Sequence, residues 1–414
     1  MSLQSQSSGD QVLFLHTNYP AQFRFLVKAY LARGWKVWFA SHTQKNKPLP
    51  SVKYVKLEKA PSKGSKLDQN QFSALIVFKQ LLSLKRNNQL NPKRIYVHAG
   101  WGLGSFLREL FPDSTIIAYS EWWFNLFSQD YLFNPSDSHV QHTLDSRLIS
   151  LLRNHSFSYE LQQADLLIAP TEWQRSQLPN NFQKKCHVVF DGIDQHMFSP
   201  GPQTKYADKR ISSLSLDTPL LTYATRGLEP YRGFPEFIKA SFELLKEHKH
   251  WHVAIAGNDS INYYKSSNAP KNGYGNEAYE FFKSHNLSSR VHFLGSLPLL
   301  AYRDLLRRSN LHCYFTRPYV LSWSFLESMF TGCRLFASNT APVLEFAQHD
   351  PDTHLVNYIQ EDVGSLLVSH VSYLEENGKL ENNGILTKSR KALRDTLSSN
   401  ACVTKHLELA DDLN

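Results

Sequence analysis

Two arginines and two glycines follow a short apolar segment in the block LTYATRGLEPYRGF (221–234). They are Arg226, Gly227, Arg232 and Gly233. Pro235 comes directly after the block, where a proline suits the first turn of a helix. A strand–loop–helix junction exposes free backbone N–H groups and the positive end of the helix dipole, and arginine donors match phosphate oxygens, so we predict an anion site here. The alternative is that both arginines form surface ion pairs with Glu229 or a neighbouring carboxylate.

A second junction of the same kind lies in PYVLSWSFLESMFTG (318–332). The turn into its predicted short helix contains Ser322, Trp323 and Ser324. We predict that the N-terminus of this helix also faces a ligand. Glu327 lies about one turn inside the helix, where its carboxylate can accept hydrogen bonds from ligand hydroxyls such as those of a ribose. The alternative for Glu327 is a structural carboxylate that accepts hydrogen bonds from nearby backbone N–H groups.

His98 ends a strand-like segment of the first half, RIYVHAG (94–100), just before the glycine-flanked Trp101. This position places His98 at the ligand-binding edge of a predicted sheet, where an imidazole can take part in proton transfer. The chain has 18 histidines, so a structural or purely hydrogen-bonding role for His98 stays open. Trp101, Trp122 and Trp123 are candidates for stacking on a sugar, with core packing as the alternative for at least one of them.

The elements that position these residues form two alternating series. In the first half, apolar runs at 12–17, 35–41, 94–100, 115–121, 165–171 and 186–192 are predicted strands separated by helix-length segments. A Pro-, Ser- and charge-rich stretch at 199–217 is a predicted interdomain linker. The alternation then resumes with predicted strands at 219–225, 251–258, 290–296, 311–317, 333–339 and 353–358.

This alternation predicts an α/β protein with two Rossmann-like, doubly wound domains, each a parallel sheet covered by helices on both faces. The predicted domains are residues 1–200 and 201–385, followed by a C-terminal helix at 386–414 that packs back on the first domain. Because ligands bind outside the carboxyl ends of the strands in such sheets, we expect the site in a cleft between the domains.

The chain of 414 residues carries a net charge of +8, which indicates an anionic partner without identifying it. It has no apolar run of the about 20 residues that a membrane helix needs, and its first residues, MSLQSQSSGDQ, lack the features of a secretory signal. We therefore expect a cytoplasmic protein. The four cysteines are far apart and form no CxxC pair, which predicts reduced structural thiols. No nucleic-acid-binding motif appears, so nucleic acid is not an expected partner.

Seven lysines fall in one short stretch in which the only acid is Glu58. They are Lys45, Lys47, Lys53, Lys56, Lys59, Lys63 and Lys66. We favour a solvated surface loop for this stretch, with peripheral attachment to an anionic membrane surface on the cytoplasmic face as the alternative.

In order and spacing, the two junctions and the SNTAP turn at 338–342 resemble the donor half of family 4 glycosyltransferases with the GT-B fold. Further segments are similar to one bacterial subgroup of that family, at 18–26, 98–107, 120–124, 169–179 and 190–200. The resemblance covers most of the chain. It implies a retaining glycosyltransferase that moves a sugar from a nucleoside diphosphate sugar to a hydroxyl on a glycan, glycolipid or protein-linked sugar. It also implies that no metal and no cofactor is needed.

The resemblance assigns roles to individual residues. Arg226 and Arg232 match the Arg and Lys that hold the donor diphosphate, with Arg in place of the Lys. Glu327 matches the last Glu of an E-x7-E motif, which binds the ribose, and His98 corresponds to a histidine near acceptor and donor sugar. The first position of the motif is Tyr319, and a phenol is not a charged acceptor at neutral pH. A GT-B sugar-nucleotide epimerase and a catalytically inactive GT-B binding protein are therefore alternatives.

Overall fold

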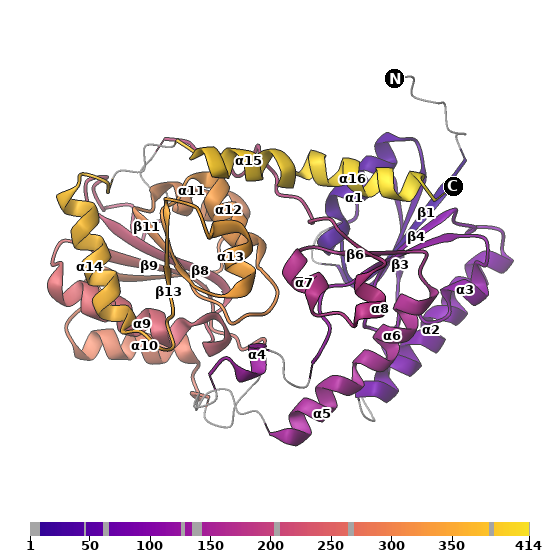
Figure 1. The fold of residues 1–414 in the computed structure, drawn as a ribbon, viewed down its shortest axis with the longest axis horizontal. Helices are drawn as coiled ribbons and strands as arrows, with labels where there is room; N and C mark the ends of the chain where they lie inside the picture. Colours follow the sequence, from indigo (N-terminus) through magenta and orange to yellow (C-terminus); the bar gives the residue numbers. More distant parts are fainter. Residues whose placement is uncertain are drawn as a thin grey trace. The chain divides into compact units, whose positions relative to one another are not determined.

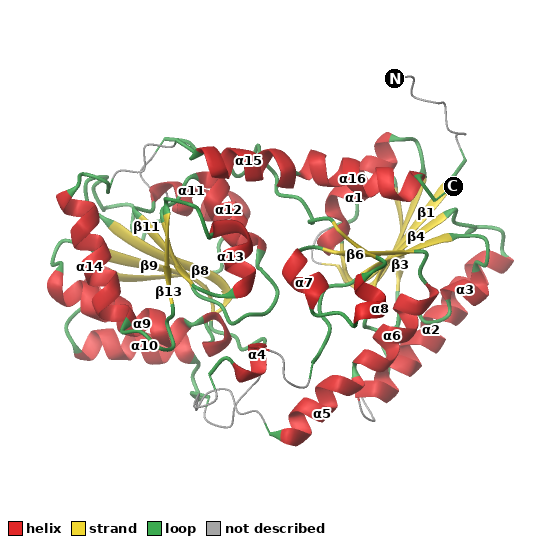
Figure 2. Cartoon of the chain, in the orientation of Figure 1, coloured by secondary structure: helices red, strands yellow, loops and turns green. Residues whose placement is uncertain are grey.

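The chain forms two compact α/β units in a computed structural model (Figure 1). The structure describes residues 9–44, 47–60, 66–125, 129–134, 143–202, 208–263, 269–380 and 385–413. The first unit contains the described residues of Met1–Ser128, Thr143–Gly192 and Leu397–Asn414, and the second those of Gln129–His142 and Ile193–Thr396. Helices flank a central sheet in each unit, as Figure 2 shows.

The first unit is built on a seven-stranded parallel sheet with the strand order β3-β2-β1-β4-β5-β6-β7. Its strands are β1 (Gln11–Tyr19), β2 (Lys36–Gln44), β3 (Val52–Lys56), β4 (Arg94–His98), β5 (Thr115–Tyr119), β6 (Leu166–Ala169) and β7 (Cys186–Val188). On β1, Leu13 and Leu15 pack into the core on one face, while the ring of Phe14 packs against those of Phe39 and Tyr96 on the other. Both faces are buried, which explains the continuous apolar runs of these strands.

The helices of the first unit are short apart from one. They are α1 (Arg24–Ala32), α2 (Lys66–Arg86), α3 (Leu107–Leu110), α5 (Leu144–Leu152), α6 (Asn154–Gln163), α7 (Glu172–Ser176), α8 (Asn180–Gln183) and α16 (Ser399–Asp411). Val77 of α2, Leu107 of α3 and Phe157 of α6 contribute to the core on one face of the sheet. None of the helices in the described residues is long and apolar enough to span a membrane.

The second unit is built on a six-stranded parallel sheet with the strand order β10-β9-β8-β11-β12-β13. Its strands are β8 (Leu220–Gly227), β9 (His252–Asn258), β10 (Val291–Gly295), β11 (Leu311–Tyr314), β12 (Leu335–Ser338) and β13 (Thr353–Val356). Its helices are α4 (Gln129–Leu132), α9 (Phe234–Glu247), α10 (Tyr274–Ser284), α11 (Leu299–Arg308), α12 (Trp323–Thr331), α13 (Ala341–Ala347), α14 (Val363–Glu376) and α15 (Lys388–Leu397).

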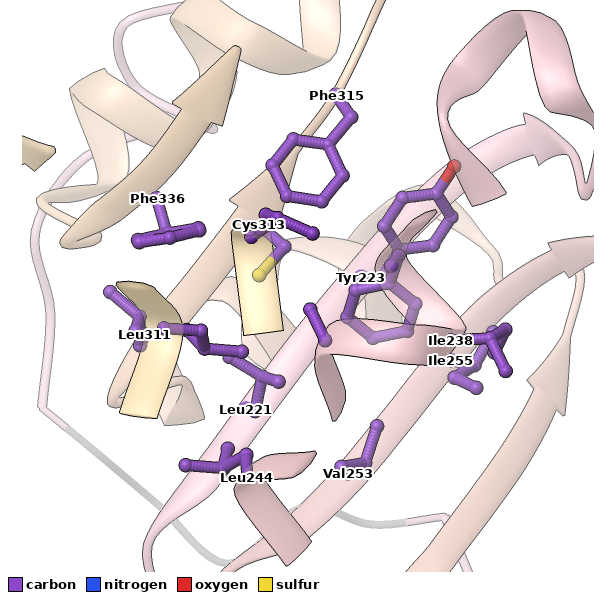
Figure 3. Close-up of a cluster of buried hydrophobic side chains, with 14 of the residues drawn as sticks. Leu221, Tyr223, Ile238, Leu244, Val253, Ile255, Leu311, Cys313, Phe315 and Phe336 are labelled. Carbon is purple, nitrogen blue, oxygen red and sulfur yellow. The ribbon is translucent and has the colours of Figure 1, made fainter. Parts of the chain in front are cut away.

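Side chains alternate between the two faces of β8, as the period of a strand requires. Leu221 and Tyr223 join the core beneath α9, α10 and α14, part of which is seen in Figure 3. Leu220 and Ala224 join a separate core with Leu305 of α11 on the other face. The predicted doubly wound fold with two parallel sheets is confirmed.

Every predicted strand is present, but β3 was not predicted. Its sequence, VKYVK, lies within the lysine-rich stretch that was assigned to a solvated loop, and that assignment is wrong for Val52–Lys56. The strand pairs with β2 at the edge of the sheet. Charged side chains, lysine above all, are common on edge strands because they prevent the open edge from pairing with another chain. Lys53 lies over the ring of Trp38, with 4.8 Å between Nζ and the ring centroid.

The C-terminal stretch differs from the single predicted helix, because it forms two helices that belong to different units. On α15, the buried Arg390 forms an ion pair with Asp350 of 2.7 Å and donates to the carbonyl of Cys333, all within the second unit. On α16, Asp411 forms a 2.7 Å ion pair with the buried Arg94 of the first unit.

The observed division also differs from the predicted boundary at residue 200, because the chain passes from the first unit to the second after Gly192. The segment around α4 belongs to the second unit although the predicted first domain included it. The reason is that the phenol of Tyr231 donates to the carboxylate of Asp130 at 3.1 Å, and the buried guanidinium of Arg317 donates to the carbonyl of Asp130 at 3.3 Å.

Candidate functional site

A pocket lies in the second unit where β8 and β11 run side by side. From β8 the chain continues to β9 and β10 on one side of the sheet, and from β11 to β12 and β13 on the other, so this is the topological switch point. The pocket is partly open to solvent. Its lining comes from the carboxyl ends of the two strands and the turns after them: Tyr223, Ala224, Thr225, Arg232, Cys313, Tyr314, Phe315, Ser322 and Ser324. Ligands of doubly wound sheets bind at this position.

Arg232 supplies the positive charge of the pocket wall. It ends the short helix η2 (Pro230–Arg232), and its partly buried guanidinium donates to Thr316 Oγ1 at 3.4 Å and to the phenol oxygen of Tyr263 at 3.5 Å. These contacts are long and use neutral acceptors, so they neutralise little of the charge. Burial lowers the pKa of Arg232, but the nearby Tyr263, Tyr314 and Glu229 raise it further, and the guanidinium stays charged.

The N-terminus of α12 forms the opposite wall of the pocket. Ser322 is the N-cap residue, and its side chain accepts from the backbone N–H of Ser324 at 3.4 Å. The Ser324 hydroxyl donates to the Ser322 hydroxyl at 2.9 Å. The N-cap satisfies one of the free donors of the first turn, and the remaining N–H groups and the helix dipole favour an anion in the pocket.

Two tyrosines at the strand ends hold these two walls. The phenol of Tyr223 on β8 donates to the carbonyl of Arg232 at 2.8 Å, and the phenol oxygen of Tyr314 on β11 accepts from the N–H of Ser322 at 3.2 Å. Burial raises the pKa of both tyrosines, so both phenols keep their protons at neutral pH. Neither residue was predicted as part of the site, because each lies in an apolar strand run that is typical of core. The only available signal was a tyrosine near the carboxyl end of each strand that precedes a predicted junction.

The two predicted glycines pack against protein atoms and do not line the pocket. Gly233 has φ +65°, a left-handed conformation that favours glycine, and a Cβ on it would lie 2.5 Å from Cβ of Phe315. Gly227 lies against the loop after β9, where a Cβ would come within 2.5 Å of the carbonyl of Ser260. Both glycines therefore allow the close approach of backbone that places Arg232 in the pocket wall.

Arg226 is exposed and lies outside the pocket lining, one residue after Thr225. It lies within the register shift between Ala224 and Gly227 in the pairing of β8 with β9. Within the described part of the chain, its side chain makes no hydrogen bond or ion pair. The alternative of a surface pair with Glu229 is not what the structure has, because Glu229 is buried and accepts from the backbone N–H groups of Asn262 and Tyr263 at 2.6 and 3.0 Å.

Glu327 and Trp323 lie on α12 behind the pocket lining. The side chain of Glu327 is buried one turn inside the helix, and its charge helps burial to raise the pKa of Tyr302. Trp323 is the first residue of the helix and is partly buried. The structure thus brings Arg232, Ser322 and Ser324 together in one pocket, with Glu327 and Trp323 on the same helix and Arg226 beside it.

Tyr319, in the place of the expected carboxylate, belongs to an aromatic cluster. Its ring centroid lies 5.5 Å from that of Tyr231 and 5.6 Å from that of Tyr263, both in edge-on geometry. Tyr231 and Tyr263 stack at 4.7 Å, and the guanidinium of Arg232 lies 5.3 Å from the Tyr263 ring centroid. The cluster therefore supports the pocket arginine from the side by packing and by a cation–π contact.

His98 lies in the first unit, at the carboxyl end of β4 and buried. The indole N–H of Trp101 donates to its Nδ1 at 3.1 Å, and its Nε2 lies 3.5 Å from a carboxylate oxygen of Glu121. Trp101 is 39% exposed, so a ligand can reach its ring. Trp122 is buried and Trp123 packs against Phe157, which is the packing role that was the alternative for these tryptophans.

The lysine-rich stretch is described only in part. Lys45 and Lys63 and the side chain of Lys66 lie outside the described residues, whereas Lys47, Lys53, Lys56 and Lys59 are exposed. In the second unit, Asp350 and Asp352 form ion pairs with Arg390 and Arg334. Among the described residues, no group of three or more His, Cys, Asp or Glu side chains has an arrangement that could hold a metal ion.

The chain was compared with models of protein families and with curated protein sequences. Residues 33–198 match a family model described as the glycosyl transferase family 4 group. Comparison with curated protein sequences gives no match.

Several solved structures have the same fold over nearly the whole chain. Sucrose-phosphate synthase from Thermosynechococcus elongatus is 16% identical, with a TM-score of 0.69 over 98% of this chain and 99% of that chain. A glycosyltransferase from Rickettsia africae is 13% identical, with a TM-score of 0.69 over 98% of this chain and 99% of that one. HepE from Anabaena, in complex with UDP-glucose, is 14% identical, with a TM-score of 0.66 over 97% and 99%.

These findings confirm the predicted GT-B fold, and the family model that matches residues 33–198 describes glycosyltransferases, the predicted class. The chain has the two-sheet GT-B architecture, and its residues 33–198 match the model of the glycosyl transferase family 4 group.

Proposed function

We propose that the protein transfers a sugar from a nucleoside diphosphate sugar to a hydroxyl acceptor, with retention of configuration and without a metal ion. The observation that carries this proposal is the pocket at the switch point of the second sheet, in which Arg232 faces the N-terminus of α12 with Ser322 and Ser324. An arginine and a helix N-terminus together bind a diphosphate well, because both offer fixed positive charge and N–H donors. HepE, a structural neighbour, binds UDP-glucose and UDP, so a UDP-sugar is the first donor to test.

In this proposal the second unit binds the donor. The diphosphate lies between Arg232 and the first turn of α12, with Arg226 reaching toward it from the exposed end of β8. Glu327 accepts from the ribose hydroxyls, and Gly227, Gly233 and Trp323 shape the backbone and the helix start around the pocket. As the bond to the sugar breaks, negative charge grows on the leaving diphosphate, and preorganised donors stabilise this charge without rearranging.

The first unit binds the acceptor, with His98 and the exposed ring of Trp101 beside it. Retention follows from attack on the same face from which the diphosphate leaves, and the donor phosphate takes up the proton of the incoming hydroxyl. His98 then orients this hydroxyl or the donor sugar. Tyr319 cannot supply the negative charge of the missing carboxylate, so the donor sugar is held there by packing and by neutral hydrogen bonds.

The test is a thermal-shift screen with UDP, GDP, ADP and dTDP, run on the wild type and on Arg232→Ala. A ligand that binds only the folded protein raises Tm. At a ligand concentration of 100 times Kd, it adds about 2.7 kcal/mol to the free energy of unfolding. We expect one nucleotide to raise the Tm of the wild type and to leave that of Arg232→Ala nearly unchanged. If none of the four nucleotides raises the Tm of the wild type, or if both proteins show equal rises, the assignment of the pocket to a diphosphate is wrong.

Tyr319 also favours one second candidate, a GT-B binding protein without transfer activity. Such a protein would show the nucleotide-dependent shift in Tm but no turnover of any sugar donor with any acceptor. A sugar-nucleotide epimerase, by contrast, would convert the donor without an acceptor. Incubating the protein with UDP-glucose and UDP-N-acetylglucosamine, with and without a mixture of sugar acceptors, separates these outcomes by product analysis.

We further propose that the protein works in the cytoplasm and reaches lipid-linked acceptors by peripheral contact with the membrane. The exposed Lys47, Lys53, Lys56 and Lys59 support this contact, since each lysine near an anionic surface contributes about 1 kcal/mol. Co-sedimentation with vesicles that contain phosphatidylserine, compared with purely zwitterionic vesicles, tests it. Equal binding to the two kinds of vesicle, or binding to neither kind, would contradict the proposal.

A further inference from the structure

The first unit contains a buried carboxylate that has no part in the donor pocket. Glu160 lies on α6, is 1% exposed, and forms no ion pair with a lysine or arginine of the described residues. Its two oxygens accept from different backbone groups: Oε2 from the N–H of Gly100 at 2.5 Å and Oε1 from the N–H of Gly104 at 2.6 Å. A buried charge is costly unless hydrogen bonds compensate it, and here the backbone of one loop provides those bonds.

That loop, Gly100–Gly104, has alternating glycines and follows β4 directly. Gly100 and Gly102 have φ of +97° and +78°, a conformation that turns successive N–H groups toward one point. A Cβ on Gly104 would come within 2.9 Å of Val97 and 3.2 Å of Glu160. In many nucleotide-binding proteins such a glycine-rich loop after a strand holds a phosphate. Here the carboxylate of the protein occupies that place.

Other contacts fix the loop on both sides. Asn70 of α2 donates to the carbonyl of Gly100 at 3.4 Å, and its own backbone lies so close to Gly102 that a Cβ there would clash with it. Gln163, one turn after Glu160 on α6, donates to the carbonyl of Ser105 at 2.9 Å. The loop is therefore held between two helices with Glu160 at its centre.

The loop also determines the state of His98, because Trp101 lies between the first two glycines. An indole N–H can only donate, so the 3.1 Å bond from Trp101 requires that Nδ1 of His98 accepts. The neutral imidazole then carries its proton on Nε2, the atom that lies 3.5 Å from Glu121. Position and tautomer of His98 thus depend on where the loop holds Trp101.

We propose that Glu160 is a positioning residue, whose carboxylate fills the N–H cradle of Gly100–Gly104 and thereby sets the orientation and tautomer of His98 through Trp101. The cradle is an internal anion site and does not bind a phosphate of the substrate. The part of this proposal that concerns transfer rests on the proposed function. The part that concerns the loop and the imidazole does not.

The test uses the full-length protein labelled with ¹⁵N in histidine and tryptophan. In the wild type we expect one His98 tautomer, with the proton on Nε2, and a hydrogen-bonded Trp101 indole signal. Glu160→Gln places an amide NH₂ against a backbone N–H, so the loop should release Trp101, and His98 should become a mixture of tautomers. Trp101→Phe, which leaves the carboxylate in place, should change His98 in the same way and identifies the Trp101 signal.

Three comparisons keep the result specific. Glu109→Gln makes the same change at an exposed carboxylate of α3 and should leave both signals as in the wild type. Glu160→Asp keeps the charge and should restore part of the His98 pattern. Inorganic phosphate added to the wild type should not move the Trp101 signal. An unchanged His98 pattern in Glu160→Gln, or a saturable shift with phosphate, would overturn the proposal.

Kinetics then connect the loop to transfer. A misplaced active-site group costs about 10- to 100-fold in rate, so kcat of Glu160→Gln should fall by that factor, while KM for the donor stays within about 2-fold. A parallel loss of donor affinity would contradict a role confined to the first unit. If the wild type transfers no sugar at all, the proposed function fails, but the NMR comparison still decides the role of Glu160.

Discussion

Both units have a switch point with the same topology, at β1 and β4 in the first sheet and at β8 and β11 in the second, but the chemistry at the two positions differs. At the first, His16 on β1 and His98 at the end of β4 have ring centroids 4.4 Å apart and are both buried. The glycine loop beside them is filled by the carboxylate of Glu160. At the second, a partly buried arginine and a helix N-terminus line an open pocket.

The two positions differ in whether the protein itself supplies an anion to the free N–H groups. A cradle of N–H groups binds an external anion only if the protein does not supply an anion itself. In the first unit the carboxylate of Glu160 accepts from the N–H groups of the loop itself. In the second unit Arg232 forms no ion pair among the described residues, although the charge of the buried Glu229 helps to raise its pKa, and its hydrogen bonds go to neutral acceptors. A glycine-rich loop after a strand is therefore weak support for a phosphate site until its interior contacts are known.

The largest expected effect comes from removing the charge of the open pocket. Arg232→Ala should lower kcat/KM for the donor selected by the nucleotide screen by about 100- to 1000-fold, because one preorganised donor to a developing oxyanion contributes that much. Arg232→Lys should recover part of the rate, since a lysine keeps the charge but not the fork. Initial rates at varied donor concentration measure both.

The matched control for this change is Arg24→Ala, a partly buried arginine of the first unit that donates to the carbonyl of Gly192 at 3.1 Å. It removes the same side chain without touching the pocket, so donor KM should stay close to that of the wild type. If Arg24→Ala lowers donor affinity as much as Arg232→Ala, the two units do not divide the ligand chemistry as proposed.

The next effect concerns the closed cradle and its dependence on pH. Burial raises the pKa of Glu160 from its ordinary 4.5 to about 7, although the N–H groups of Gly100 and Gly104 oppose the rise. The folded protein therefore binds more protons than the unfolded chain between these values. The contribution of Glu160 to stability is fully present below pH 4.5 and is lost as pH rises through about 7.

Glu160→Gln removes this titration. As the pH rises from 4.5 to above 7, the unfolding free energy of the wild type should therefore fall by about 3 kcal/mol relative to that of the variant. Titrating groups that lie away from the loop and do not interact with Glu160 cancel in the difference. Urea unfolding at several pH values measures it, with Glu109→Gln as the control. A difference that is flat across this range would mean that Glu160 ionises normally inside the fold.

The sequence predicted the sheets well and the site unevenly, for physical reasons. Strands buried on both faces are long apolar runs, which are easy to recognise, whereas the edge strand β3 alternates valine and tyrosine with lysine and resembles a charged loop. Arg232 was predicted as a site residue because its residue type alone suggests an anion, and it lines the pocket of the second unit. Glu160 was not, because it lies on a helix about 60 residues from the loop it holds, and no local pattern connects them.

A smaller effect is expected from loosening the pocket without changing its charge. Tyr223→Phe removes the phenol that donates to the carbonyl of Arg232 at 2.8 Å. One lost hydrogen bond costs about 1 kcal/mol, so nucleotide affinity should fall by about 3- to 10-fold. Tyr96→Phe, which removes a buried phenol that pairs with Tyr30 at 3.1 Å in the first sheet, should cost similar stability but leave nucleotide affinity unchanged. Calorimetric titration with the nucleotide compares the two variants, and equal losses of affinity would deny Tyr223 a specific role.

The smallest effect separates the two arginines of the second unit. Arg226 is exposed and outside the pocket lining, so its attraction to the diphosphate acts through water and Arg226→Ala should weaken donor binding only about 2- to 5-fold. Salt screens such an interaction, and at about 0.5 M NaCl the difference from the wild type should vanish, whereas the loss in Arg232→Ala should persist. Donor affinity at low and high salt for both variants tests this. A large loss in Arg226→Ala that survives high salt would mean that Arg226 enters the pocket when the donor binds and contacts the diphosphate directly.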